Sequence, residues 1–243
     1  MSQIDREFVV IQRNPTAGAG TSRRILLDLV KELRKQIFGV RMFSDRDRLD
    51  AFVTSEQIGS RIRCLVAAGG SGTVADLVNR HPKHPIAVLT MGTENLIARH
   101  LNIPRYGSVV ADTIQKGHVQ PFDTTQAENR QYLLMASAGI DADVVHRLHA
   151  TRSGNIRHWT YIRPILQAFA SYYFPEITVT DVQTEKTVTG SYVIVSKFKE
   201  CGFNLKLTPN ADAIDGWLDA RVFQGTSVTR SSVFFARRMA HSW

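Results

Sequence analysis

The stretch Leu65–Asn79 (LVAAGGSGTVADLVN) constrains the fold of this chain more than any other. It has the pattern of a short apolar strand, a glycine-rich turn and the first turns of a helix. Gly69, Gly70 and Gly72 remove Cβ atoms from the turn, so its backbone can approach a ligand closely. The first N–H groups of a helix lack partners within the helix and carry partial positive charge. The stretch therefore predicts an anion site, and phosphate is the anion most often bound in this way.

Further strand–turn–helix units in the first half predict an α/β domain with a parallel sheet. Phe8–Ile11 and Ile86–Leu89 are apolar runs typical of buried parallel strands. The helices expected in this half cover Ile25–Leu33, Thr73–Asn79, the residues from Gly92 to about His100, and Val109–Lys116.

After about Asp123 the pattern changes and predicts a mainly-β or α+β second domain. The polar stretch Gln126–Asn129 favours a boundary there, which gives domains of residues 1–124 and 125–243. The expected strands are Gln131–Met135, Ile177–Thr180, Val188–Val195, Leu205–Leu207 and Leu218–Phe223. The expected helices are Asp141–His149, Trp159–Tyr172 and one from about Val228.

The composition of the chain indicates which partners and which cellular compartment to expect. A net charge of +8 favours anionic partners such as nucleotides, nucleic acid or acidic lipid surfaces, although it also fits a general bias toward basic residues. Cys64 and Cys201 lack metal-type spacing, which fits a reducing compartment. The first residues are polar and mixed in charge, and Arg163 interrupts the best apolar run. We therefore expect a cytoplasmic protein, with peripheral membrane contact allowed.

Three glycine turns follow predicted strands: Asn14–Gly20, Gly69–Gly72 and Met91–Asn95. A single turn of this kind is usually no more than a turn. In an open α/β sheet, however, ligands bind outside the carboxyl ends of the strands, so three such turns would converge on one crevice. Together they favour a nucleotide- or phosphate-binding site.

Neither standard nucleotide motif is complete. Gly70–Ala75 fits G-x-G-x-x-A, but Thr90 stands where an acidic residue would bind the ribose. The Gly-Lys-Ser/Thr of a Walker A loop does not occur in the sequence. The sequence therefore predicts a phosphate site of another kind.

Four segments together resemble the diacylglycerol kinase catalytic-domain family, which includes bacterial lipid kinases and sphingosine kinases. They occur in the family's order and are Asn14–Gly20, Gly69–Val74, Gly92–Ala98 and Pro209–Asp219. The resemblance implies an N-terminal α/β nucleotide domain and a β-sandwich-like C-terminal lipid-substrate domain, with the active site in the cleft between them. It also implies transfer of the ATP γ-phosphoryl group to a hydroxyl of a diacylglycerol-like lipid at a membrane surface. Nucleic acid is not an expected partner, and the sequence allows a homodimer.

Carried over position by position, the resemblance implies an ATP site and a magnesium site. The ATP-binding positions are Asn14, Pro15, Thr16, Ala17, Gly18, Ser44, Gly70, Ser71, Gly72, Thr73, Val74, Ala75, Asp76 and Thr93. The magnesium ligands are Asp212, Asp215 and the backbone carbonyl of Trp217. Two carboxylates three residues apart around a glycine turn also suit a hard cation. Without the resemblance, these aspartates would be interpreted as solvated turn residues.

The chain also departs from the family pattern. Ser71 stands where the family has Asp, Ala17 where it has Ser, Leu96 where it often has Asp, and Ala75-Asp76 where it has Asn-Glu. The family's Asp-Gly-Glu segment with its proposed catalytic base has no counterpart before Trp243, so no catalytic residue is assigned and weak turnover is expected. Two alternatives therefore stay open: a catalytically impaired nucleotide- or lipid-binding relative, and a soluble-substrate kinase such as an NAD kinase. The Pro209–Asp219 segment argues against the NAD kinase.

Overall fold

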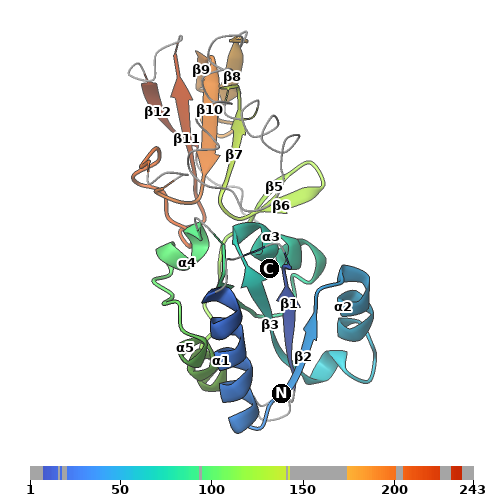
Figure 1. Ribbon diagram of the computed structural model, residues 1–243. Coiled ribbons are helices and arrows are strands. Elements are labelled where there is room, and N and C mark those ends of the chain that lie inside the picture. The colour runs from blue at the N-terminus through green and yellow to red at the C-terminus, as the bar shows by residue number, and fades with distance from the viewer. Residues whose placement is uncertain are drawn as a thin grey trace. The chain divides into compact units, whose positions relative to one another are not determined.

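The chain forms two compact units, which are described separately (Figure 1). The computed structural model describes residues 8–15, 17, 21–92, 95–140, 142, 174–200, 205–224 and 231–236. The first unit comprises Met1–Gln120 and Glu128–Gln131, and the second comprises Pro121–Ala127 and Tyr132–Trp243. The boundary expected at 124/125 falls inside a segment that clusters with the second unit.

The first unit is built on a parallel sheet in the order β2-β1-β3-β4. Its strands are β1 (Phe8–Arg13), β2 (Gly39–Phe43), β3 (Ile62–Gly69) and β4 (Ile86–Thr90). The two central strands, β1 and β3, are nearly continuous apolar runs and are almost completely buried, as parallel strands covered on both faces should be. The predicted α/β class of this half is therefore confirmed.

Helices α1 (Thr21–Lys35) and α5 (Gly107–Lys116) lie side by side and share one core cluster with β1 and β3. Gly107 permits the close approach, since a Cβ there would lie 2.3 Å from the Ile25 carbonyl oxygen and 2.3 Å from the Leu29 nitrogen. Cys64 belongs to the same cluster, and burial raises the pKa of its thiol to about 12. This thiol is a core side chain and not a reactive group.

The remaining helices of this unit are short. They are α2 (Arg46–Val53), the 3₁₀ turn η2 (Gly59–Arg61), α3 (Ser71–Arg80) and α4 (Leu96–His100). The sequence analysis missed α2, because only Leu49 and Val53 of its residues are buried. The available signal was Asp45, whose side chain caps the helix by accepting a hydrogen bond of 2.9 Å from the Arg48 nitrogen.

The second unit contains an antiparallel sheet in the order β12-β11-β10-β7, which confirms its predicted β-rich class. Tyr192 stacks on Phe223 between β10 and β11, with ring centroids 4.9 Å apart. The described residues also form two hairpins: β8–β9 belongs to this unit, and β5–β6 contains residues Glu128–Gln131, which cluster with the first unit. The strands are β5 (Thr125–Ala127), β6 (Arg130–Tyr132), β7 (Met135–Ala138), β8 (Ile177–Thr180), β9 (Thr187–Gly190), β10 (Tyr192–Ser196), β11 (Leu218–Phe223) and β12 (Ser231–Ala236).

Four element predictions in this half were wrong. Val188–Val195 is divided at Ser191, whose nitrogen bonds to the Phe223 carbonyl while β9 turns to pair with β8. Gln131–Met135 is likewise divided between β6 and β7, and Leu205–Leu207 forms a turn with a Leu207 N–Leu205 O bond of 3.1 Å. The helix expected from Val228 is instead strand β12, because pairing with β11 overrides a short apolar run that fits either structure.

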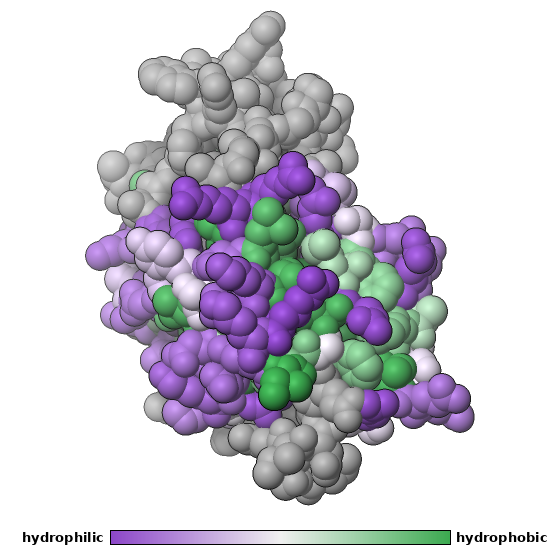
Figure 2. Space-filling view, turned by 60° about the horizontal axis from the view of Figure 1, so that its bottom comes forward, coloured by the Kyte–Doolittle hydropathy of each residue, from purple (hydrophilic) through white to green (hydrophobic). Residues whose placement is uncertain are grey.

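The helices expected over Asp141–His149 and Trp159–Tyr172 fall outside the described residues, apart from Ala142. No helix in the described part of the chain has the length and apolar character needed to cross a membrane. Figure 2 shows one face of the molecule, on which hydrophilic residues predominate and hydrophobic residues are exposed in patches between them. Exposed large hydrophobic side chains of the first unit include Leu27, Ile37 and Met42.

Candidate functional site

The carboxyl ends of β1, β3 and β4 meet at one edge of the parallel sheet. The Asn14 nitrogen donates to the Ala68 carbonyl at 3.0 Å, and the Met91 nitrogen donates to the Gly69 carbonyl at 3.0 Å. Backbone hydrogen bonds thus continue from the strands into the first residues of each glycine turn. The structure brings the described residues of the three turns together, as the sequence predicted.

Glycine is required where these turns touch each other. A Cβ on Gly69 would lie 2.2 Å from Thr73 Oγ1 and 3.3 Å from Asn14 Cβ. A Cβ on Gly92 would lie 2.8 Å from the Gly70 Cα, which is a backbone atom that cannot swing away. The contacts of 2.2 Å and 2.8 Å are shorter than real Cβ atoms make, and the contact of 3.3 Å is tighter than most, so Gly69 and Gly92 allow the turns to pack against one another.

Gly72 differs from the other glycines of the turns. A Cβ on Gly72 would meet no atom within 4 Å, and Gly72 does not adopt the left-handed backbone conformation. It lies in the first turn of α3, whose N-cap residue Gly70 supplies no side-chain capping bond. Open space and uncapped amides at a helix N-terminus are what a bound anion needs.

The third turn is held in shape by Asn95, which is 9% exposed. It adopts a left-handed conformation with φ 49° and ψ 43°. Its Oδ1 accepts a bond of 2.8 Å from the Gly92 nitrogen, and its Nδ2 donates to the Gly92 carbonyl at 2.6 Å. Next to this turn, at the end of β4, Thr90 Oγ1 is buried and has no hydrogen-bond partner among the described residues.

The predicted ATP-binding residues fall into three groups. Asn14, Pro15 and Ala17 follow β1, and Ser44 is exposed after β2 at the same edge, because Gln12 pairs with Phe43. Ser71 to Asp76 form the start of α3, where the side chains of Thr73 and Val74 are buried. Thr16, Gly18 and Thr93 lie outside the described residues. Contact of all the predicted residues with ATP stays a prediction.

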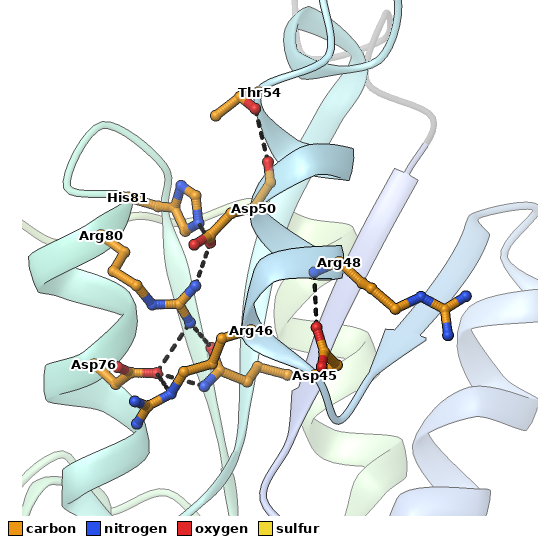
Figure 3. A network of polar contacts seen from close by, with 9 residues as sticks. Asp45, Arg46, Arg48, Asp50, Thr54, Asp76, Arg80 and His81 are labelled. Carbon is orange, nitrogen blue, oxygen red and sulfur yellow. Dashed lines mark hydrogen bonds and ion pairs between the residues drawn. The ribbon is translucent and has the colours of Figure 1, made fainter.

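Asp76 takes part in a polar network that joins α3, α2 and the end of β1 (Figure 3). Its Oδ2 accepts bonds from Gln12 Nε2 at 2.6 Å and Arg80 Nη2 at 2.9 Å, and lies 3.2 Å from Arg46 Nε. Arg80 also pairs with Asp50, whose Oδ1 lies 2.6 Å from His81 Nε2.

This network fixes the charge of Asp76. Burial alone would raise the pKa of Asp76, but hydrogen bonds from Gln12 and Arg80 and the charges of Arg80 and Arg46 outweigh it and lower the pKa. Asp76 is therefore an ionised residue that binds neighbouring side chains. Its visible role is to position α3 against α2.

A second polar cluster lies in the second unit, around the turn that leads into β11. Lys197 follows β10, and its side chain is 2% exposed. Its Nζ lies 2.8 Å from Asp123 Oδ2 and 3.1 Å from Asp215 Oδ1, and it also donates to the Trp217 carbonyl. The sequence analysis missed both Lys197 and Asp123.

Asp123 also shapes this turn through the backbone. Its nitrogen donates to the Ala213 carbonyl at 2.9 Å, and its Oδ2 accepts a bond of 2.7 Å from the Gly216 nitrogen. Gly216 has φ +73°, which L side chains rarely adopt. The turn is thus held by one aspartate from the segment before β5.

The proposed magnesium ligands do not form one donor set. Asp212 Oδ1 accepts a bond of 3.1 Å from the Ile214 nitrogen, whereas Asp215 and the Trp217 carbonyl both bind the lysine ammonium. Within the described ranges, no cluster of three or more His, Cys, Asp or Glu side chains could hold a metal ion. Two of the three proposed ligand oxygens therefore already bind the ammonium group of Lys197, and this arrangement does not fit an additional magnesium ion.

Asp219 adds a third carboxylate to this region. It pairs with Ser196 across β10 and β11 and is 6% exposed. Burial and the nearby Asp215 raise its pKa, and the charge of Lys197 opposes them. The carboxylates thus outnumber the single ammonium group.

Two family models match the chain. Residues 8–127 match the diacylglycerol kinase catalytic domain, and residues 135–239 match the YegS C-terminal NAD kinase beta sandwich-like domain. Together with the two sheets, these matches define an α/β unit followed by a β-rich unit. The chain belongs to the diacylglycerol kinase catalytic-domain family.

Similar proteins carry the same family name. The chain is 27% identical to a diacylglycerol kinase of Staphylococcus carnosus over 87% of this chain and 71% of that protein. It is 31% identical to one of Staphylococcus epidermidis, but that alignment covers 52% of this chain and only 42% of the relative.

Solved structures show the shared fold. A putative diacylglycerol kinase from Bacillus anthracis aligns with a TM-score of 0.68 at 20% identity, covering 95% of this chain and 84% of that one. A second structure from the same organism aligns with a TM-score of 0.65 at 24% identity, covering 90% and 76%.

Proposed function

We propose that this chain is a lipid kinase that transfers the γ-phosphoryl group of ATP, bound with magnesium, to a hydroxyl of a diacylglycerol-like lipid at a membrane surface. The observation that carries the proposal is the convergence of three glycine turns at the carboxyl edge of the sheet, in a chain of this kinase family. The basic net charge of +8 supports contact with anionic lipid and nucleotide.

The residues of the first unit support phosphate binding. The amides at the start of α3 and the open space beside Gly72 would receive the phosphates, while Asn95 and the close Gly70–Gly92 contact keep the turns in place. Phosphoryl transfer relies mainly on positioning and on stabilising the charge of the transferred group. The magnesium that accompanies the nucleotide would supply much of that charge.

A second candidate is a relative that binds nucleotide but transfers phosphate poorly. Ser71 favours it, because the family pattern that the chain resembles implies an aspartate at this position, and a neutral hydroxyl can neither hold a metal nor accept a proton well. Both candidates require ATP binding, so they differ in turnover alone. A soluble acceptor such as NAD is the further alternative that an assay must include.

ATP binding is tested by isothermal titration calorimetry with millimolar ATP and magnesium. Wild type should bind, Gly72→Ala should bind more weakly, and Gly72→Val should lose binding by about 100-fold or more, because its side chain would enter the space proposed for the phosphates. Thermal denaturation is the control, since a side chain at Gly72 meets no atom within 4 Å and should leave the fold intact. Absence of ATP binding by wild type would exclude both the kinase and its impaired relative.

Turnover is tested with radiolabelled ATP and a panel of diacylglycerol, a sphingoid base and NAD. We expect slow transfer to diacylglycerol by wild type and an increase of about 100-fold in Ser71→Asp, the lower end of what general acid–base residues contribute. Ser71→Asn is the matched control, because it has similar size but no carboxylate. Fast transfer by wild type would show that another residue acts as the base, and transfer to NAD alone would refute the lipid acceptor.

A further inference from the structure

The ammonium group of Lys197 has three oxygen partners, two of them in the turn before β11. An ammonium has three N–H donors and no acceptor. Three oxygens surround it: Asp123 Oδ2, Asp215 Oδ1 and the Trp217 carbonyl. They come from the segment before β5 and from the turn itself, so one side chain at the end of β10 joins separate parts of the second unit.

We infer that the Lys197 ammonium is the resident cation of this turn, and that the second unit orders the turn without a divalent metal. The proposal concerns the second unit only and does not depend on ATP binding or phosphoryl transfer. It replaces the magnesium site expected at Asp212, Asp215 and Trp217 with an internal ion pair.

Magnesium and the ammonium compete for the same oxygens. Magnesium requires near-octahedral oxygen ligands at 2.0–2.1 Å. An ion placed on Asp215 Oδ1 and the Trp217 carbonyl would lie against Nζ, whose distance from Asp215 Oδ1 is 3.1 Å. Either the two cations would repel at short range, or a side chain that is 2% exposed would lose its partners. Binding of the metal therefore requires displacement of Lys197.

Removing the lysine should convert the turn into a metal site. Asp123 Oδ2, Asp215 Oδ1 and the Trp217 carbonyl, which all contact the ammonium group, would then lie close to one another without a compensating charge. Carboxylate and carbonyl oxygens are the ligands that hard divalent cations prefer. We therefore expect Lys197→Ala, and not wild type, to bind magnesium or manganese at this turn.

Site-specific binding is tested by titrating paramagnetic Mn²⁺ into the ¹⁵N-labelled chain of 243 residues without nucleotide. The amide signals of Gly216 and Trp217 should stay sharp in wild type and in the control Lys199→Ala, which removes an exposed lysine two residues away. The same signals should broaden in Lys197→Ala. Selective broadening of these two amides in wild type would overturn the proposal, even if the variant fails to fold.

Stability is the second measurement. Lys197→Ala should lower the Tm of the second unit by about 5–10 °C in EDTA, because it leaves carboxylates without their partner, and Lys199→Ala should not. Millimolar magnesium should restore at least half of that loss. A Lys197→Ala protein with the wild-type Tm in EDTA would overturn the proposal, because the ammonium would then contribute nothing to the turn.

Discussion

The turn between β3 and α3 and the turn that leads into β11 both adjoin a strand, but their hydrogen-bonding groups are satisfied differently. The first begins a helix without a side-chain cap and has open space beside Gly72. The second has a lysine whose three donors meet three oxygens of the same unit. We propose that the first turn accepts an anion from outside the chain, whereas oxygens of the second already bind the ammonium group of Lys197.

The difference shows why a motif alone does not establish a site. Asp212 and Asp215 have the spacing of metal ligands, yet the cation at Asp215 is an internal one. The glycine turn has no complete standard motif, yet its geometry leaves a place for a phosphate. Whether a segment can bind an external ion depends on whether another part of the fold already satisfies its hydrogen-bond donors and acceptors.

The largest expected change in the free energy of unfolding concerns a pair of glycines in the first unit. Gly92→Ala would place a Cβ 2.8 Å from the Gly70 Cα, so we expect it to lower the free energy of unfolding by about 2–3 kcal/mol. Gly72→Ala should leave it unchanged or raise it by up to about 1 kcal/mol, because alanine favours the helix. Urea denaturation measures both, and equal losses would mean that Gly72 is not in open space.

A smaller effect is expected from the network around Asp76. Arg80→Met removes the cation shared by Asp76 and Asp50, and Figure 3 shows that Arg80 lies between these carboxylates. Because the groups are partly exposed, we expect a loss of about 1–2 kcal/mol in the free energy of unfolding. Arg48→Met is the control, since the Arg48 side chain points away from the network in the same figure. A similar loss in both variants would show that helix propensity, and not the network, sets the effect.

The sequence predicted the backbone of the first unit well. Apolar runs such as Phe8–Ile11 and Leu65–Ala68 are long enough to give buried parallel strands with little ambiguity. Helix α2 was missed because tertiary contacts stabilise a short segment that has only two buried side chains. Strand β12 was predicted as a helix because its short apolar run fits either structure, and pairing with β11 decides between them.

The side-chain sites were less predictable for a related reason. Asp123 and Lys197 are 74 residues apart, and Gln12 and Asp76 are 64 apart, so no spacing motif connects either pair. The topology of the sheets brings them together. Sequence reasoning could propose that Asp215 binds a cation, but it could not tell a lysine of the same chain from a metal ion.

The last prediction compares one aspartate from each unit and concerns the sign of a pH effect. The pKa of Asp76 is lowered, so its contribution to stability is present above the unfolded pKa of about 4 and is lost as the pH falls through its folded pKa. The pKa of Asp219 is raised by burial and by Asp215. Its favourable contribution is present below about pH 4 and is lost as the pH rises through its folded pKa.

The isosteric amides should therefore have opposite effects at pH 7. Asp76→Asn should lower the Tm, and Asp219→Asn should raise it by about 1–2 °C, because it removes a buried charge that Asp215 repels. Both differences from wild type should shrink as the pH falls toward 3. Calorimetric scans between pH 3 and 7 measure them. A Tm of Asp219→Asn below that of wild type at pH 7 would mean that attraction by Lys197 outweighs burial and repulsion, which would make Asp219 a fourth partner of the ammonium.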